Sequence, residues 1–191
     1  MRAYKGLFVV VSDPVDLLCM EALRSSRNVT GEGRPLTADQ IFGCGLGVMH
    51  ARASWYARQA KDTAARRYLS EGRGFGPHGE GLVIANSTDL RHYDNAASED
   101  LTEKTVLANM EVRELGFKPF LAPAMSSAVL TLLAMVRGEW NYSAAYLNGL
   151  YFGALNRQDG SGTHWEEDEL PDLLYARLER SYRRLEEILW N

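Results

Sequence analysis

Two side chains in this chain suit proton-transfer chemistry on a small organic acid. His78 lies in the glycine-rich segment Gly76-Pro77-His78-Gly79-Glu80, and an imidazole can give or take a proton while a hydroxyl and a ketone interconvert. Arg52 carries a guanidinium group, which can hold a carboxylate through two parallel hydrogen bonds and so fix its orientation. Each residue alone also fits a solvated surface position, so the elements that carry them decide the interpretation.

The start of the chain predicts a strand. Gly6 to Val11 is a short β-branched and aromatic run that ends at Ser12-Asp13-Pro14. This pattern is typical of a strand that is buried on both faces in the middle of a parallel sheet. Such a strand needs neighbours, and no strand precedes it in this sequence. We therefore expect the chain to lack the preceding part of a larger protein.

The rest of the sequence predicts an α+β arrangement. Arg52 lies beside the apolar stripe of a helix that begins near Val48. The residues of this stripe are Met49, Ala53, Tyr56, Ala60, Ala64 and Tyr68. Ala124 to Arg137 is apolar on nearly every side, which predicts a helix buried at the centre of the protein. Further helices are predicted at Leu17–Leu23, from Ser98 as N-cap to Gly116, and from Pro171 onward, and strands at Leu82–Ala85 and within Tyr142–Asn156. The last of these helices has an apolar stripe of Leu174, Leu178, Tyr182, Leu185 and Leu189.

Composition limits the classes of partner. A net charge of −4 over 191 residues gives no electrostatic reason to expect nucleic acid or an anionic membrane. No apolar run reaches the roughly 18 residues of a membrane span, and the N-terminus has no signal-peptide pattern, so we expect a cytoplasmic protein of one main domain. Cys19 and Cys44 lack metal-ligand spacing, which predicts buried thiols and no metal site.

Two glycine patterns resemble a dinucleotide-binding fingerprint only superficially. They are Gly43-Cys44-Gly45-Leu46-Gly47 and Gly72-Arg73-Gly74-Phe75-Gly76. Neither has the Gly-x-Gly-x-x-Gly spacing at a strand-to-helix turn, with an acidic residue about 20 residues further along. We expect no complete NAD site in this chain.

Four segments, in order, resemble the second half of a lactate/malate dehydrogenase. They are Val9–Asp16, Gly76–Glu80, Phe120–Ala124 and Ser143–Gly153. In that family a strand ends in Asn-Pro-x-Asp, a helix carries Asp-x-x-Arg and a later loop carries Gly-x-His-Gly, followed by Ala-Pro-Ala and Tyr-Leu-x-Gly segments. The resemblance implies that His78 is the proton-transfer residue and that Arg52 binds the substrate carboxylate.

The chain departs from that pattern at two positions. Met49 stands where the family places the aspartate that orients the histidine, and Asp13 replaces the asparagine at the strand end. Because that asparagine contacts substrate and coenzyme in the family, the resemblance implies that Asp13 is a substrate-binding residue. A carboxylate at this position would repel an acidic substrate unless it turns toward a cation. His50 could fill the aspartate position after a one-residue slip, but a histidine cannot stabilise an imidazolium as a carboxylate does. One hypothesis is that Asp13 has become the carboxylate partner of His78. The rival hypothesis is that both changes mark a site that has lost dehydrogenase chemistry.

The resemblance further implies a division at residue 16. Residues 1–16 would be the last part of a dinucleotide-binding domain, and residues 17–191 a lactate/malate dehydrogenase-like C-terminal domain. The implied cofactor is NAD, held mostly by a missing N-terminal domain, so the isolated chain should be inactive. The implied ligand is a small 2-keto or 2-hydroxy acid, and the implied assembly is a homodimer or higher oligomer, with a dimer surface that includes the aromatic strands from Tyr142 to Phe152.

Two other functions stay open. A degenerate dehydrogenase domain could serve binding or assembly, as Met49 and Asp13 favour. NAD- and metal-dependent glycosidases share the two-domain plan and use cysteine and histidine ligands, for which Cys44 with His50 or His78 would be candidates.

Overall fold

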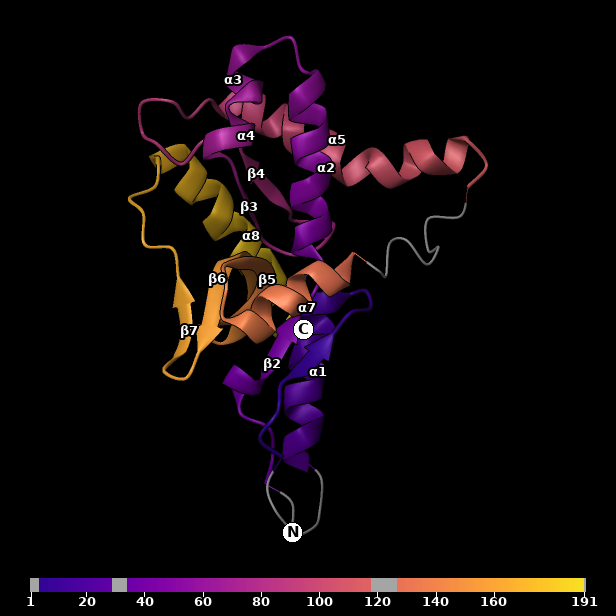
Figure 1. Ribbon diagram of the computed structural model, residues 1–191, viewed down its shortest axis with the longest axis vertical. Helices are drawn as coiled ribbons and strands as arrows, with labels where there is room; N and C mark the ends of the chain where they lie inside the picture. Colours follow the sequence, from indigo (N-terminus) through magenta and orange to yellow (C-terminus); the bar gives the residue numbers. More distant parts are fainter. Residues whose placement is uncertain (1–3, 29–33, 118–126, 191) are drawn as a thin grey trace.

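The computed structural model describes residues 4–28, 34–117 and 127–190, which form two sheets surrounded by helices (Figure 1). The larger sheet has the order β1 (Phe8–Val10), β2 (Ile41–Gly43), β5 (Asn141–Leu147), β6 (Leu150–Asp159) and β7 (Gly162–Trp165). β1 pairs with β2 in parallel and the other neighbours are antiparallel. The smaller sheet is the hairpin of β3 (Arg73–Phe75) and β4 (Val83–Ala85).

Alternating side chains place helices on both faces of the five-stranded sheet. Ile41 and Ala144 pack with α1 (Val15–Asn28) and with the second half of α8 (Asp172–Trp190). The adjacent residues Phe42 and Ala145 pack on the opposite face with α7 (Ala128–Arg137). The predicted apolar stripe of the C-terminal helix is therefore correct, and Leu174 and Leu185 are buried.

A second core lies around α2 (Leu46–Gln59), which Figure 1 shows beside α3 (Thr63–Arg66), α4 (Tyr68–Glu71) and α5 (Asn95–Glu114). Met49, Ala53 and Tyr68 of the predicted stripe are buried there. The predicted stripe is divided among three helices. α2 ends at Gln59, the short α3 follows, and Tyr68 is the first residue of α4. A short 3-10 turn, η1 (Ala38–Gln40), leads into β2.

The prediction that the first strand is buried on both faces is wrong. β1 is an edge strand of the described sheet, with Val10 buried but Leu7 and Phe8 exposed by 40% and 44%. Its neighbour β2 comes later in the sequence, which local pattern could not show.

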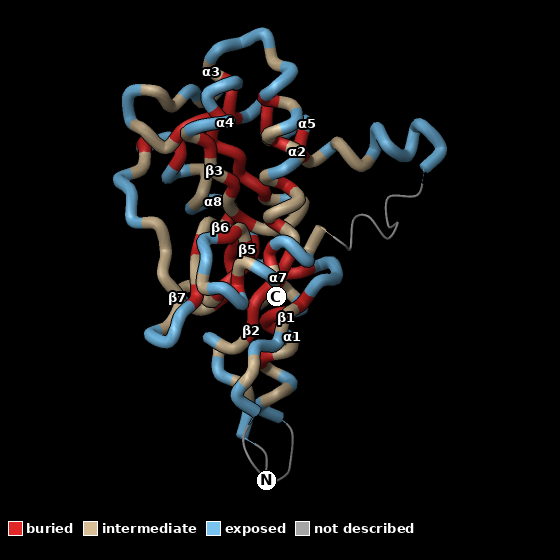
Figure 2. Tube along the Cα trace, viewed as in Figure 1, coloured by how far each residue is buried: buried red, intermediate tan, exposed pale blue. Residues whose placement is uncertain are grey.

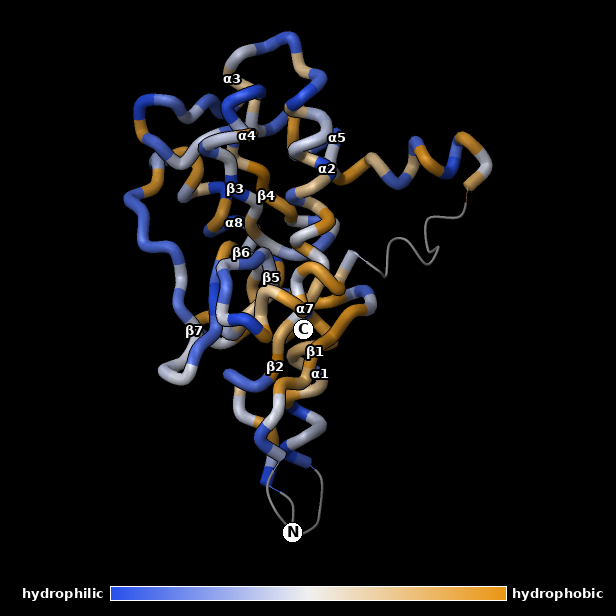
Figure 3. Tube along the Cα trace, in the orientation of Figure 1, coloured by the Kyte–Doolittle hydropathy of each residue, from blue (hydrophilic) through white to orange (hydrophobic). Residues whose placement is uncertain are grey.

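The prediction of a centrally buried helix before Arg137 is also wrong. Within α7 only Thr131 and Met135 are buried, whereas Leu130 and Val136 are 74% and 83% exposed. The C-terminal half of α5 projects away from the other elements in Figure 1, and Figure 2 shows it largely exposed. Figure 3 shows hydrophobic residues along α7 and along the C-terminal half of α5.

One further expectation needs correction. α5 begins one turn before Ser98, because the Asp94 carboxylate caps the helix by accepting from the Ala97 N–H, 2.9 Å away. Tyr151 and Phe152 of the aromatic strands are buried within this chain, and the dimer surface stays a prediction. None of the helices in the described residues has the length and apolarity needed to cross a membrane.

Candidate functional site

His78 lies in the connection between β3 and β4, which other elements hold in place. The Gly76 N–H donates to the Gly153 carbonyl at 2.8 Å, and the Ser181 hydroxyl donates to the Gly81 carbonyl at 2.6 Å. Gly76 and Gly81 have φ values of +86° and +93°, which L side chains rarely adopt. The glycines therefore build a defined turn around His78.

Asp13 meets His78 from the end of β1. The Cys44 N–H donates to the Val10 carbonyl at 2.8 Å and so extends the pairing of β1 with β2 toward this turn. The Asp13 Oδ1 lies 2.7 Å from the His78 Nδ1, with the Asp13 side chain 65% exposed and the His78 side chain 20% exposed. The hydrogen bond with His78 is the main cause that lowers the pKa of Asp13, against a smaller opposing effect of burial. This is the contact required by the hypothesis that Asp13 has become the carboxylate partner of His78.

A second carboxylate, which sequence reasoning gave no role, lies behind His78. Asp16 is 4% exposed in the first turn of α1, and its Oδ1 has no hydrogen-bond partner among the described residues. Burial raises the pKa of Asp16 to about 7, although a hydrogen bond from the backbone of His78 opposes the rise. The sequence did hold a sign of this buried carboxylate: Asp16 stands three positions after Asp13, among the apolar residues that begin the first helix.

Arg52 lies on the second turn of α2 and lines a pocket of about 350 Å³. Residues of α7, including Leu130 and Thr131, form the other side of this pocket. Burial lowers the pKa of Arg52, and the charges of Tyr56 and Asp13 partly offset this effect. Arg52 is thus within electrostatic range of the Asp13–His78 pair, but neither member of that pair lines its pocket.

The two residues considered for the missing aspartate do not orient His78. Met49 is 2% exposed, and its sulfur accepts a weak hydrogen bond from Arg52 Nη1 at 3.7 Å. The Nδ1 of His50 lies 2.8 Å from the Tyr68 hydroxyl, and its ring stacks on Tyr142 with centroids 4.3 Å apart. Burial lowers the pKa of His50 to about 4, so this imidazole is neutral at neutral pH.

One of the two glycine patterns packs closely against other parts of the chain. Gly43-Cys44-Gly45 connects β2 to α2, so it lies at a strand-to-helix turn, although it lacks the Gly-x-Gly-x-x-Gly spacing. A Cβ on Gly43 would lie 2.2 Å from Val15 Cγ1, and one on Gly45 would lie 3.0 Å from the His78 Cβ. Side chains of this chain therefore occupy the space that a side chain would need at these two glycines.

The same part of the chain offers no ligand set for a metal. No group of three His, Cys, Asp or Glu side chains in the described residues could hold an ion. Cys44 is buried, and His50 is engaged with two tyrosines. The glycosidase interpretation therefore has no metal centre within this part of the chain.

Solved structures provide the comparison. Malate dehydrogenase from Archaeoglobus fulgidus in complex with NADH matches 95% of this chain with a TM-score of 0.66 and 19% identity. Malate dehydrogenase from Aeropyrum pernix gives 0.71, 15% identity and 95% coverage, and minor L-lactate dehydrogenase from Enterococcus mundtii gives 0.70, 20% and 97%. The match covers 60%, 63% and 63% of those chains, respectively.

No family model and no curated protein matches the sequence. The Phe120–Ala124 segment of the resemblance lies outside the described residues, whereas the other three segments lie in β1 and its following turn, in the His78 turn and in β5–β6. The chain thus has the fold of part of a malate or lactate dehydrogenase and spans about three-fifths of such a protein.

Proposed function

We propose that this chain is the substrate-binding part of an NAD-dependent 2-hydroxy acid dehydrogenase of the lactate/malate type. The observation that carries the proposal is the 2.7 Å contact between His78 and Asp13, with Arg52 within electrostatic range. In this proposal Arg52 binds the substrate carboxylate and His78 exchanges a proton with the hydroxyl or keto oxygen. Asp13 takes the orienting role that Met49 cannot fill.

The geometry supports His78 as the proton-transfer group. Its Nδ1 faces Asp13, which leaves Nε2 as the nitrogen that can face a substrate oxygen. A carboxylate on Nδ1 stabilises the imidazolium form and fixes the orientation of the ring. When His78 donates its Nε2 proton to a keto oxygen, the neutral imidazole keeps its Nδ1 proton hydrogen-bonded to Asp13.

The pairing also removes an objection to Asp13. A free carboxylate would repel an acidic substrate. Because Asp13 is paired with His78 and is further influenced by the positive charge of Arg52, its charge is balanced while the imidazole is protonated. We infer that an anionic substrate binds best to this protonated state.

Hydride exchange needs a coenzyme domain in addition to these residues. Neither glycine pattern of this chain has the dinucleotide-binding spacing, so we propose that NAD binds to polypeptide beyond the described residues. The isolated chain should bind the acid without turning it over. Assembly as a homodimer or higher oligomer remains a prediction, which sedimentation velocity would test.

The binding step can be tested on the chain itself. We expect pyruvate and L-malate to bind with millimolar dissociation constants in isothermal titration calorimetry at about pH 6, because mildly acidic solution favours the protonated form of an imidazole. Arg52→Gln should weaken binding about tenfold or more, since a charge-assisted bidentate contact contributes roughly 1.5–3 kcal/mol. Arg58→Gln is the matched control, because Arg58 is an exposed residue of the same helix.

Two outcomes would reject the proposal. Equal binding by the Arg52 and Arg58 variants would remove the carboxylate-binding role. If the affinity for the acid does not fall from about pH 6 to about pH 8.5, binding does not depend on the protonated Asp13–His78 pair.

A non-catalytic role is the second candidate, and Met49 is the observation that favours it. The aspartate that the family uses is replaced by a side chain that is 2% exposed and contacts Arg52. Under this alternative His78→Gln would leave acid binding unchanged at every pH. Under the dehydrogenase proposal the same variant would abolish the pH dependence of binding.

A further inference from the structure

A second concave surface lies apart from the proposed substrate site. It is a groove of about 640 Å³ between α8 and the strands β6 and β7, and none of Asp13, Arg52 and His78 lines it. This volume lies in the range of small-molecule sites. Five aromatic side chains line the groove: Phe75, Phe152, Trp165, Tyr175 and Tyr182.

The aromatic lining is held in place by contacts made behind the groove. The hydroxyl of Tyr182 donates to the carbonyls of Leu147 and Asn148 at 3.0 and 2.9 Å. Its ring lies 5.7 Å from that of Phe152 at an interplanar angle of 50°. Tyr175, seven residues or about two turns earlier on α8, is 61% exposed. The groove thus combines fixed rings on its floor with one accessible ring at its rim.

The charges in the groove leave an excess of carboxylate. Arg73 binds Glu166 through two hydrogen bonds of 2.5 and 2.6 Å, and Arg183 pairs with Glu179 at 2.6 Å. Glu186 also lines the groove and forms no ion pair with any described residue. Together with burial, its charge raises the pKa of Tyr182, which places the Glu186 carboxylate within electrostatic range of the aromatic floor.

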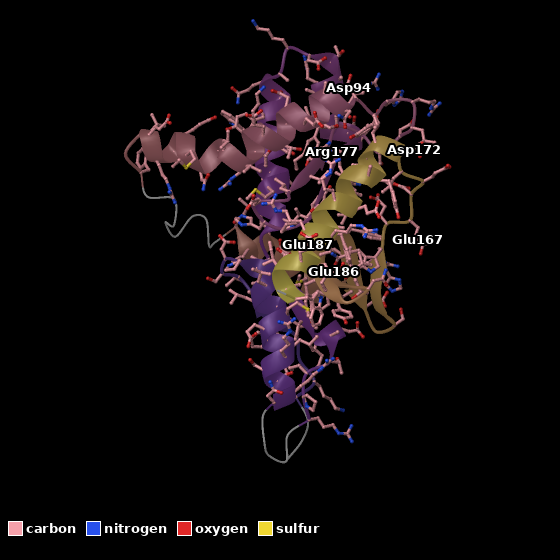
Figure 4. All side chains as sticks on the ribbon, turned by 180° about the vertical axis from the view of Figure 1, so that it is seen from behind. Asp94, Glu167, Asp172, Arg177, Glu186 and Glu187 are labelled. Atoms are coloured by element: carbon pink, nitrogen blue, oxygen red, sulfur yellow. The ribbon has the colours of Figure 1, made fainter. Side chains whose placement is uncertain are left out.

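The approach to the groove is acidic as well. Residues 166–169 are Glu-Glu-Asp-Glu and connect β7 to α8. Figure 4 shows Glu167 on this connection, Asp172 at the start of α8, and Glu186 with Glu187 further along the helix. The groove thus lies next to a segment that attracts positive charge.

We propose that this groove binds a small organic cation with an apolar body, of the quaternary or tertiary ammonium class. Aromatic faces attract such cations through their quadrupoles, and the attraction grows when the cation loses water. Glu186 supplies the counter-charge, and the apolar substituents of the cation cover the rings. A neutral ligand of the same shape would gain only the apolar contact.

The test compares choline with 3,3-dimethylbutan-1-ol, in which carbon replaces the charged nitrogen. Chemical shift changes of the intact chain, followed by two-dimensional NMR, report both affinity and location. We expect choline to bind about three- to tenfold more tightly than the neutral alcohol, from the usual strength of a partly exposed cation–π contact. The shifts should concentrate on Trp165, Tyr175 and Tyr182.

Substitutions distinguish binding inside the groove from a general attraction of cations to an acidic surface. Glu186→Gln should weaken choline binding about three- to fivefold, whereas Glu187→Gln makes the same change in net charge at a residue that does not line the groove and should have no effect. Tyr175→Leu should weaken binding, and Tyr175→Phe, which keeps the ring, should not.

Several results would overturn the proposal. They are equal affinity for choline and the alcohol, equal effects of the Glu186 and Glu187 substitutions, and shifts located away from the groove. Tighter binding of a lysine-rich peptide than of choline would mean that the groove serves a basic polypeptide instead. Because Arg52 does not line the groove, Arg52→Gln should leave choline binding unchanged, so this test stands independently of the proposed dehydrogenase function.

Discussion

The Asp13–His78 pair should contribute a coupling energy that depends on pH in a particular way. A double-mutant cycle with Asp13→Asn and His78→Gln measures this energy, because each substitution removes one charge and keeps a polar group of similar size. The two side chains are in hydrogen-bond contact at 2.7 Å. The cycle therefore isolates the interaction that carries the proposed function.

Its magnitude follows from the exposure of the two groups. Exposed ion pairs contribute roughly 0.2–1 kcal/mol, and pairs out of solvent contribute more. The His78 side chain is 20% exposed but that of Asp13 is 65% exposed, so solvent screens the pair from one side. We expect about 1 kcal/mol at about pH 5.5, near the upper limit for exposed pairs.

The coupling should fall on both sides of this pH. On the basic side, loss of the imidazole proton removes the ionic part of the coupling. On the acid side, the pKa of Asp13 is lowered in the folded protein, mainly by His78. Its contribution is therefore present above the pKa of an unfolded aspartate and is lost as the pH falls through the folded value.

Urea unfolding followed by circular dichroism at about pH 3, 5.5 and 8.5 gives the required free energies. The control is the exposed pair of Lys104 and Asp100 on α5, whose atoms lie 2.6 Å apart with side chains 48% and 50% exposed. That pair should couple by about 0.3–0.5 kcal/mol, with no change between the two higher pH values. A coupling for Asp13 and His78 that is zero, or that is the same at about pH 5.5 and 8.5, would refute the reasoning.

Three other substitutions test the surroundings of the site, each by urea unfolding. Asp16→Asn should stabilise the protein relative to the wild type increasingly from about pH 4 to 7, because burial raises the pKa of Asp16 to about 7 and ionising the buried carboxyl costs free energy; a pH-independent difference would contradict this. His50→Gln should reduce the loss of stability between about pH 6.5 and 4, since the folded pKa of His50 is lowered to about 4 and only the unfolded chain takes up the proton in that window; an unchanged acid limb would contradict it. Gly43→Ala should lower the free energy of unfolding by about 1–3 kcal/mol, because the new Cβ would lie 2.2 Å from Val15. Gly160→Ala, with nothing within 4 Å of its Cβ, should change the free energy of unfolding little. Similar losses of stability at the two positions would contradict the close packing at Gly43.

The parts of the fold with strong local patterns were predictable from the sequence. The C-terminal helix follows its apolar spacing, and Leu174 and Leu185 are buried as that spacing requires. The pairing of Asp13 with His78 followed from chemical reasoning about two unusual residues, and the two atoms are 2.7 Å apart.

Features set by distant parts of the chain were not predictable. Ala128 to Arg137 has little polar surface, yet the helix covers the sheet with one side only, so Leu130 and Val136 stay exposed. β3 could not be predicted from local pattern, because it lies in a glycine-rich stretch and Arg73-Gly74-Phe75 forms a strand by pairing with β4. Asp16 was overlooked as a partner of His78 because its burial depends on the His78 turn packing above α1.

The position of Asp13 ties the electrostatics of His78 to the edge of a different sheet. Asp13 follows β1, the outermost strand of the described five-stranded sheet, whereas His78 belongs to the β3–β4 hairpin. An edge strand offers unpaired N–H and C=O groups to a further strand. Polypeptide that docks along β1 would immobilise the Asp13 carboxylate, and a shift of β1 would withdraw it from the imidazole. Any polypeptide that extends this sheet along β1 would therefore lie beside the strand that carries the carboxylate partner of His78.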